Sequence, residues 1–151
     1  MAAPNHDIEE KVEEAIKAYL DDDATLTGVT KYLGFDTGDI AAPSLEIFCP
    51  DAEPEVLGET ATGNYFVTVE VTLRTSLDDT TRTAHGHFVA ELRDSLIATV
   101  GDVVTSIQAL GTKPADFTAH QWTPGGASRE IDEEKRQRLT IQTGILFCQP
   151  S

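Results

Sequence analysis

Hydrophobic and polar residues alternate most regularly in two stretches, residues 64–75 and 136–148. The first carries apolar side chains at every second position: Val67, Val69, Val71 and Leu73. The second keeps the same phase along its length: Leu139, Ile141, Thr143, Ile145 and Phe147. Such alternation predicts long antiparallel strands with one buried face. Two shorter apolar stretches, residues 44–49 and 117–122, predict two more strands.

Apolar residues at three- and four-residue spacing predict helices elsewhere. The first stripe runs through Ile8, Val12, Ala15, Ile16, Tyr19 and Leu20. Asn5 or Asp7 can cap this helix, and we expect it to end near Leu20, before a run of three aspartates. A second stripe repeats every fourth residue from Ala84 to Val100 and predicts a helix over residues 83–100. A short helix over residues 102–110 follows Gly101.

Three segments lack a clear period. Residues 24–40 hold some helix-spaced apolar residues but also three glycines, and we read a short helix or turn there. Residues 50–63 contain prolines, glycines and four acids without a base, which predicts a loop. Residues 123–135 open with Pro-Gly-Gly and predict a second polar loop. Both loops are either plain surface or arms that reach a neighbouring subunit.

The order of elements indicates the fold class. Two pairs of strands, each expected to form a hairpin, bracket the helix at residues 83–100. The repeated strand–helix–strand order that is typical of a parallel sheet is absent from the sequence pattern. We therefore expect residues 1–151 to form a single α+β domain, with a mainly antiparallel four-stranded sheet and helices packed on one face.

The chain is strongly acidic. Its formal charge is −15, and residues 1–60 hold 15 acids against 3 bases. Neutralising the phosphates of DNA needs clusters of Lys and Arg, and the sequence has none. Specific DNA binding and adhesion to anionic membranes are therefore not expected. The acidity is either a solvated surface that favours solubility or a surface that repels passing DNA. No apolar run approaches a membrane span, and the first residues lack signal-peptide character, so we expect a protein used inside a cell or in a particle assembled there.

Motifs for catalysis or cofactor binding are weak. His85 and His87 are the best metal candidates, but residues two apart on a helix point to different sides. The glycines of residues 58–63 are spaced as in a phosphate loop, yet Asn64 and Tyr65 replace its Lys-Ser/Thr pair. Asp21 begins a calcium-loop-like stretch that lacks the required Gly and terminal Glu. We therefore expect no catalytic, cofactor-binding or metal-binding residue, and no enzyme activity.

Two cysteines, Cys49 and Cys148, each end an apolar run next to a proline. Two are too few for a disulfide scaffold. We expect buried thiols that act as small apolar groups, although neighbouring strand ends could also bring the pair together. Trp122 lies beside the Pro-Gly-Gly turn, and we expect it to pack in the core or at its rim.

The order and size of the elements resemble the tail-terminator proteins of long-tailed bacteriophages. The matching features are an acidic N-terminal amphipathic helix, strands at residues 45–49 and 65–75, and the long helix at residues 83–100. The strand at residues 117–122, a polar loop with Arg129, Glu130 and Asp132, and the closing strand at residues 136–148 complete the match. The resemblance covers nearly the whole chain.

The resemblance implies a structural virion protein that forms a homohexameric ring at the head-proximal end of the tail. Such a ring stops polymerisation of the tail tube and joins the tail to the head connector. Its partners would be other copies of itself, the tail tube protein and the head–tail connector or stopper protein, and DNA would pass through its lumen without specific binding. It would be assembled in the host cytoplasm and located in the tail or neck of the virion. The alternatives are another neck or tail component, such as a tube subunit or head-completion protein, or a small-molecule-binding α+β domain.

A closed ring requires two different, complementary patches on each subunit. The two polar loops supply the candidates, with acids on the first and bases on and after the second: Asp51, Glu53, Glu55, Glu59, Arg129, Lys135, Arg136 and Arg138. We expect charge reversal at Arg136 and Arg138 to disrupt the ring if these patches meet.

Overall fold

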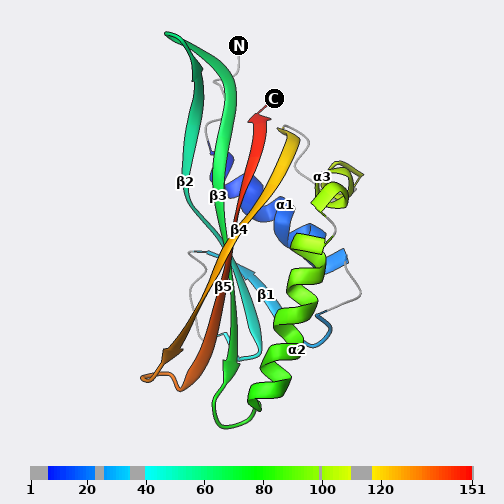
Figure 1. The fold of residues 1–151 in the computed structure, drawn as a ribbon, viewed down its shortest axis with the longest axis vertical. Helices are drawn as coiled ribbons and strands as arrows, with labels where there is room; N and C mark the ends of the chain where they lie inside the picture. Colours follow the sequence, from blue (N-terminus) through cyan, green and yellow to red (C-terminus); the bar gives the residue numbers. More distant parts are fainter. Residues whose placement is uncertain (1–6, 23–25, 35–39, 99, 110–116, 151) are drawn as a thin grey trace.

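The computed structural model describes residues 7–22, 26–34, 40–98, 100–109 and 117–150. Its elements are α1 (Ile8–Asp22), β1 (Thr30–Leu33), β2 (Ser44–Leu57), β3 (Thr60–Ser76), α2 (Arg82–Arg93), the π-helical turn η1 (Asp94–Ala98), α3 (Val100–Ala109), β4 (Phe117–Asp132) and β5 (Gln137–Pro150). The strands form one sheet in the order β1-β2-β3-β5-β4 (Figure 1). The α+β class is confirmed, as is the pairing of β2 with β3 and of β4 with β5 as antiparallel hairpins.

The prediction of a four-stranded sheet was wrong, because β1 adds a fifth strand. It lies in the segment predicted to be a short helix or turn, and it pairs in parallel with the start of β2. Leu26 and Gly28 both have positive φ, at 58° and 81°, which is incompatible with continued helix. The exposed edge of β2 then supplies backbone partners that a local pattern cannot reveal. The sheet is therefore mixed.

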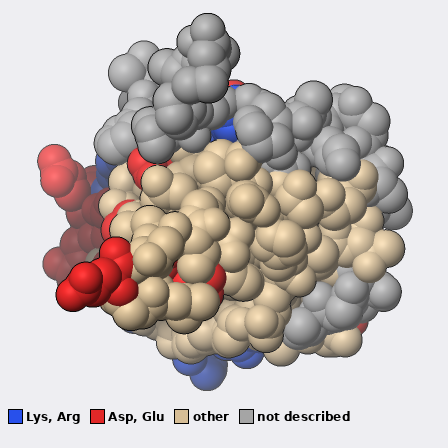
Figure 2. All heavy atoms as spheres, turned by 90° about the horizontal axis from the view of Figure 1, so that it is seen from above, with Lys and Arg blue, Asp and Glu red and all other residues tan. Residues whose placement is uncertain are grey.

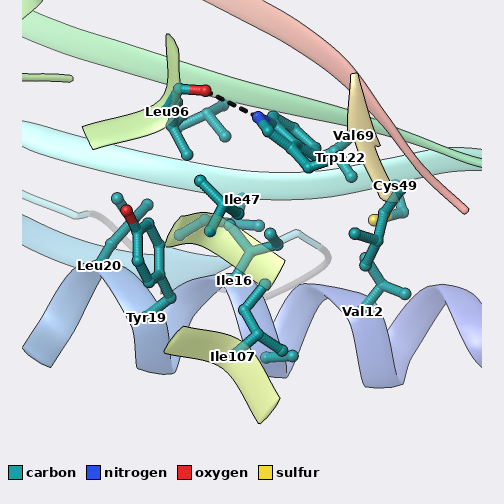
Figure 3. Close-up of a cluster of buried hydrophobic side chains, with 14 of the residues drawn as sticks. Val12, Ile16, Tyr19, Leu20, Ile47, Cys49, Val69, Leu96, Ile107 and Trp122 are labelled. Carbon is teal, nitrogen blue, oxygen red and sulfur yellow. Dashed lines mark hydrogen bonds between the residues drawn. The ribbon is translucent and has the colours of Figure 1, made fainter. Parts of the chain in front are cut away.

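The hydrophobic core lies between one face of the sheet and the helices (Figure 3). All six residues of the expected stripe on α1 are buried, so that helix is confirmed, although it continues to Asp22. The inward residues of β3 are completely buried, as the alternation predicts: Val67, Val69, Val71 and Leu73. The proposed Asn5 cap lies outside the described residues, and the Asp7 carbonyl accepts a hydrogen bond from the Lys11 amide.

The predicted loop at residues 50–63 is wrong: β2 and β3 continue to a two-residue turn at Gly58 and Glu59. The prolines in this region, Pro50 and Pro54, suggested a break because proline cannot donate to a strand ladder. Here β1 has already ended, so β2 is an edge strand and needs no donor on its outer side. Register shifts beside both prolines absorb the remaining irregularity.

The predicted loop at residues 123–135 is also mostly strand. β4 continues through Pro124 and two glycines to Asp132, and only residues 133–136 form a turn. A register shift between Pro124 and Ala127 accommodates the Pro-Gly-Gly sequence. β4 is the edge strand on this side of the sheet, so the missing donor of Pro124 is tolerated.

The predicted continuous helix at residues 83–100 is interrupted by η1. Two carbonyl groups of this turn accept hydrogen bonds from distant side chains. The Ser95 carbonyl accepts from the Tyr19 hydroxyl at 2.7 Å, and the Leu96 carbonyl accepts from Nε1 of Trp122 at 2.7 Å (Figure 3). The spacing of apolar residues does not show which backbone carbonyl groups accept hydrogen bonds from distant side chains. The sequence therefore did not predict the π-helical turn that interrupts the helix.

Both cysteines are free and buried, which confirms the expectation of small apolar thiols. They do not face each other on neighbouring strands, because β3 lies between β2 and β5. Burial raises the pKa of both thiols, that of Cys148 to about 12. The Cys49 amide donates to the buried Glu13 carboxylate at 2.8 Å, which ties α1 to β2. Burial of that carboxylate raises the pKa of Glu13.

Candidate assembly surfaces

Two hairpins extend from the sheet in opposite directions (Figure 1). We call residues 50–66 of β2 and β3 the upper arm, and residues 125–138 of β4 and β5 the lower arm. Ala52 and Tyr65 of the upper arm still pack against the core, whereas its two apolar tip residues are strongly exposed, Val56 at 53% and Leu57 at 67%. The two predicted loops are therefore mostly paired strands. Their opposed directions allow one subunit to present different surfaces at its two ends.

The four predicted acidic residues all lie on the upper arm, but they have different surroundings. Asp51 accepts a hydrogen bond from the Thr68 hydroxyl at 3.1 Å, and Glu55 accepts from Thr62 at 2.7 Å. These two carboxylates link the paired strands. Glu53 and Glu59 are exposed and form no hydrogen bond or ion pair with the described residues. Figure 2 shows acidic side chains gathered on one side of the molecule, whereas most of the described surface in that view is uncharged.

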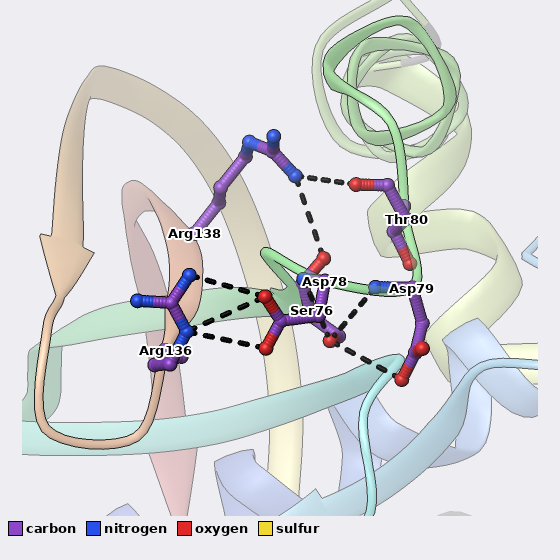
Figure 4. A network of polar contacts seen from close by, with 6 residues as sticks. All are labelled: Ser76, Asp78, Asp79, Thr80, Arg136 and Arg138. Carbon is purple, nitrogen blue, oxygen red and sulfur yellow. Dashed lines mark hydrogen bonds and ion pairs between the residues drawn. The ribbon is translucent and has the colours of Figure 1, made fainter.

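Two of the four predicted basic residues are engaged within the chain (Figure 4). Arg136 forms a forked contact with Asp78, with Nη2 at 3.1 Å from Oδ1 and Nε at 3.2 Å from Oδ2. This contact lowers the pKa of Asp78. Arg138 donates to the Thr80 carbonyl at 2.5 Å and to the Ser76 carbonyl at 3.4 Å. Both arginines fasten the turn after β3 to the lower arm, so they hold the subunit's own structure together.

Arg129 lies on the face of β4 that is turned toward α2. Its cross-strand partner is Thr140, which in turn pairs with the fully buried Leu73, so all three side chains share the helix-covered face. Lys135 lies in the exposed turn of the lower arm. Glu130, Asp132, Glu133 and Glu134 balance the four bases of this arm, so the lower arm is not a basic patch as a whole.

A groove between α2 and β4 joins the predicted Arg129 with two arginines that the sequence prediction missed. It has a volume of about 340 Å³ and is lined by Arg82, Gly86, Val89, Ala90, Arg93, Arg129 and Thr140. We call it the arginine groove. The α2 members Arg82, Gly86, Val89 and Arg93 follow one another at spacings of four, three and four residues. Such spacing places them on one face of the helix, a signal that was readable beside the core stripe.

The sheet face away from the helices is partly apolar. Phe66 and Phe147 stack there with ring centroids 4.8 Å apart, and Ile145 is exposed nearby on β5. The ring of His120 lies 5.6 Å from that of Phe147. Thr68, opposite Ile145, belongs to the same face. The aromatic pair therefore covers the outer side of β3 and β5 without help from a helix.

His85 is buried between two threonine hydroxyl groups. Its Nδ1 lies 2.7 Å from Oγ1 of Thr75 and its Nε2 lies 2.9 Å from Oγ1 of Thr140. His87 is exposed, so the two histidines do lie on different sides of α2. His85 borders a hollow of about 380 Å³ that Arg129 and Arg138 also line. Because both ring nitrogens are hydrogen-bonded, His85 supports the packing of α2 on the sheet.

Stability should fall as the pH is lowered from 7.5 to 5.5 because of His85. Burial, with further effects of Arg138 and Arg129, lowers the pKa of His85. Below about pH 6.5 the unfolded chain therefore binds a proton that the folded chain does not bind. The contribution of His85 to the free energy of unfolding is complete above that pH and is progressively lost below it. The loss is at most about 1.4 kcal/mol per pH unit for one group. Urea unfolding of wild type at pH 7.5 and 5.5 measures this loss, and His85→Gln should lack it. His87→Ala, which changes an exposed histidine, should retain the full pH dependence.

The described residues offer no evident metal site. No group of three His, Cys, Asp or Glu side chains within them is arranged to hold an ion. A hollow of about 550 Å³ beside α1 is acidic, with Glu9, Glu10 and Glu13 among its lining residues. Asp23 and Thr25 of the calcium-loop-like stretch lie outside the described residues, whereas Gly58 lies in a turn that leads into a strand. Within the described part of the chain, no helix has both the length and the apolar character that crossing a membrane requires.

Comparison with known proteins identifies a shared fold but no family. No protein-family model matches the sequence, and no curated protein matches it. Among solved structures, a chain from a structure described as the virion of a native gene transfer agent particle has a similar fold. The TM-score is 0.64, and the match covers 91% of this chain and 94% of the other at 14% sequence identity. At that identity the likeness concerns the fold.

Proposed function

We propose that this chain is a structural virion protein that assembles into a closed ring, and that the ring lies at the head-proximal end of a phage-type tail. In this role it ends polymerisation of the tail tube and joins the tail to the head connector. The ring has six copies, and the chain works by shape, without catalysis or a cofactor. DNA passes through the lumen, where the net negative charge of the subunits disfavours adhesion.

The observation that carries this proposal is the upper arm. A paired two-stranded extension that exposes Val56 and Leu57 at its tip and carries acids without a base is poorly explained by the needs of its own core. An arm at one end of the sheet and a basic groove toward the other are the unlike surfaces that a head-to-tail contact needs. The shared fold with a chain of a gene transfer agent virion supports a role in a particle of this kind.

Measuring the mass of the full chain in solution tests self-assembly. We expect a discrete hexamer over a range of micromolar concentrations, because a closed ring has a fixed number of contacts. Polymers without a limiting size would favour a tube subunit instead. A monomer at every concentration would contradict the ring.

Labelling the protein in isolated particles tests its position. We expect an antibody or a fused tag to mark one point between head and tail when particles are viewed by electron microscopy. Label along the whole tail would indicate a tube subunit. Label only on the head would indicate a head-completion protein, and either result would overturn the terminator role.

A further inference from the structure

The arginine groove concentrates positive charge on a strongly acidic protein. The chain has 11 bases in all, and three of them line this groove. Arg82, Arg93 and Arg129 are exposed, and their guanidinium groups form no hydrogen bond or ion pair with the described residues. Guanidinium groups in such a position are suited to forked contacts with carboxylates.

The groove also has an apolar part. Val89 is half-buried and Ala90 is exposed. Gly86, which lies on α2 between Arg82 and Arg93, leaves open space above the helix. A ligand that fits this surface therefore combines negative charge with apolar side chains. Each arginine lies beside a surface that can be desolvated on contact, which strengthens a charge pair relative to one in water.

The tip of the upper arm has this combination of properties. Glu59 lies in the turn and Glu53 lies farther along β2, opposite Phe66, and both are exposed acids without a partner among the described residues. Val56 and Leu57, between them at the end of β2, are exposed apolar residues. Asp51 and Glu55 are used to hold the two strands together, so the arm is pre-ordered. Little conformational entropy is lost when such a hairpin docks.

The tip cannot reach the groove of its own chain. The upper arm extends from one end of the sheet, whereas α2 and the neighbouring part of β4 lie toward the other end (Figure 1). A contact between the two must join different copies. Because the surfaces are unlike, each copy offers a free tip at one side and a free groove at the other, which is the head-to-tail arrangement that a ring of identical subunits requires.

We propose that the acidic tip of the upper arm docks in the arginine groove of the next copy, and that this contact closes the ring. The inference rests on the proposed function and assigns its interface. Glu53 and Glu59 pair with two of the three groove arginines, while Leu57, the more exposed of the two apolar residues, covers Val89 and Ala90. Arg136 and Arg138 contribute through the fold of each subunit and do not lie in the contact.

Charge reversal on each side tests the contact. The groove variant Arg93→Glu/Arg129→Glu and the arm variant Glu53→Arg/Glu59→Arg should each raise the concentration needed for assembly at least about 100-fold. Each variant removes two charge pairs, and a close pair across an interface couples by about 1.5 kcal/mol or more, which is about tenfold in affinity for each pair. Lys17→Glu/Lys135→Glu changes the net charge as the groove variant does, away from both surfaces, and should assemble like wild type. Sedimentation over a concentration series gives the comparison. Arg82→Glu/Arg93→Glu replaces the groove variant if the change at Arg129 disturbs His85.

Mixing the two variants makes the test specific. The arm variant has a positive tip and a positive groove, and the groove variant has both negative. In either variant alone, tip and groove carry the same charge and repel each other. An equal mixture should restore hexameric rings in which the two variants alternate, and mass measurement should find three copies of each. Tryptophan fluorescence and the urea midpoint of each variant should match wild type, because all four changed residues are exposed.

The outcomes separate the interface from the function. If wild type forms hexamers and the groove variant does so at the same concentration, the interface is wrong and the ring stands. If both variants are folded monomers and their mixture stays monomeric, the pairing of tip with groove is wrong. If wild type binds a short DNA duplex and the groove variant loses that binding without a change of mass, the groove is a phosphate site and the inference is overturned. If wild type never assembles, the proposed function fails with it.

Discussion

Replacing Trp122 with alanine should lower the free energy of unfolding by about 3–5 kcal/mol, the usual cost of removing a large buried aromatic side chain. Trp122 is 2% exposed and lies on β4 beneath η1. The change leaves a cavity and removes the donor to the Leu96 carbonyl. Urea unfolding followed by far-UV circular dichroism measures the loss, because Trp122 is the only tryptophan of the chain.

Trp122→Phe serves as the control for this prediction. The phenyl ring preserves much of the packing but cannot donate to the Leu96 carbonyl, so the expected loss is smaller, about 1–3 kcal/mol for one unsatisfied buried acceptor. A loss below 1 kcal/mol for Trp122→Ala would mean that the indole does not hold η1 against the sheet.

Gly144→Ala should destabilise the protein by about 1–3 kcal/mol through overpacking. Gly144 lies on β5 directly under the indole ring of Trp122. A methyl group there would lie 2.5 Å from Cζ2 and 2.9 Å from Cζ3 of Trp122, closer than real Cβ atoms approach other carbons. The indole is held by its hydrogen bond to Leu96 and cannot move aside without losing it.

Gly126→Ala is the matched control, since Gly126 lies on the neighbouring strand β4 and a methyl group there meets nothing within 4 Å. We expect its free energy of unfolding to stay within about 0.5 kcal/mol of wild type. Combining Gly144→Ala with Trp122→Ala should remove most of the cost of the glycine change, because the clashing ring is gone. Additive losses in the double variant would contradict steric contact as the cause.

Trp122 also connects the fold with the proposed assembly. The indole fixes η1 to β4, and α2, which carries one wall of the arginine groove, leads directly into η1. His85 fixes the same helix to β3 and β5 through its two threonine partners. The distance between α2 and β4, and so the width of the groove, is therefore set from both sides by buried side chains that do not themselves line its surface.

Local periodicity was a reliable guide on α1 and β3, because burial repeats with the geometry of the backbone, every 3.6 or every two residues. The same reasoning placed His85 and His87 on different sides of α2. The prediction of helices on one face of an α+β sheet follows from these patterns alone. The phase predicted for β5 was wrong: Thr140, Gln142, Leu146 and Cys148 share the buried face with the inward residues of β3, whereas Ile145 and Phe147 lie on the opposite face of the sheet. Apolar residues occupy both faces of β5, so alternation alone could not show which face is buried.

Periodicity failed at the edges of the sheet. The upper arm and β4 contain glycines, prolines and charges that locally favour turns, and β1 lies between glycines in the segment 24–40, yet all three are paired strands. Their backbone groups find partners on a neighbouring strand, and an edge strand tolerates proline on its free side. The acids of the upper arm were predicted, whereas two of the groove arginines, Arg82 and Arg93, were not, because their spacing places them on one helix face but does not show which strand that face adjoins.

The amino-acid order alone was sufficient to predict an acidic α+β chain with an amphipathic first helix and four strands in two antiparallel pairs, because charge is additive along the chain and the periodicity of each element is local. It also named the acidic arm residues and Arg129. The extension of those strands through the two predicted loops came from the structure. The tertiary structure decided which bases remain available to a partner: Arg136 and Arg138 are used within the subunit, whereas Arg129 joins two arginines of α2. Whether a charged side chain forms its hydrogen bonds within the subunit depends on which atoms from distant parts of the sequence lie within hydrogen-bonding distance. Only the folded chain determines those distances.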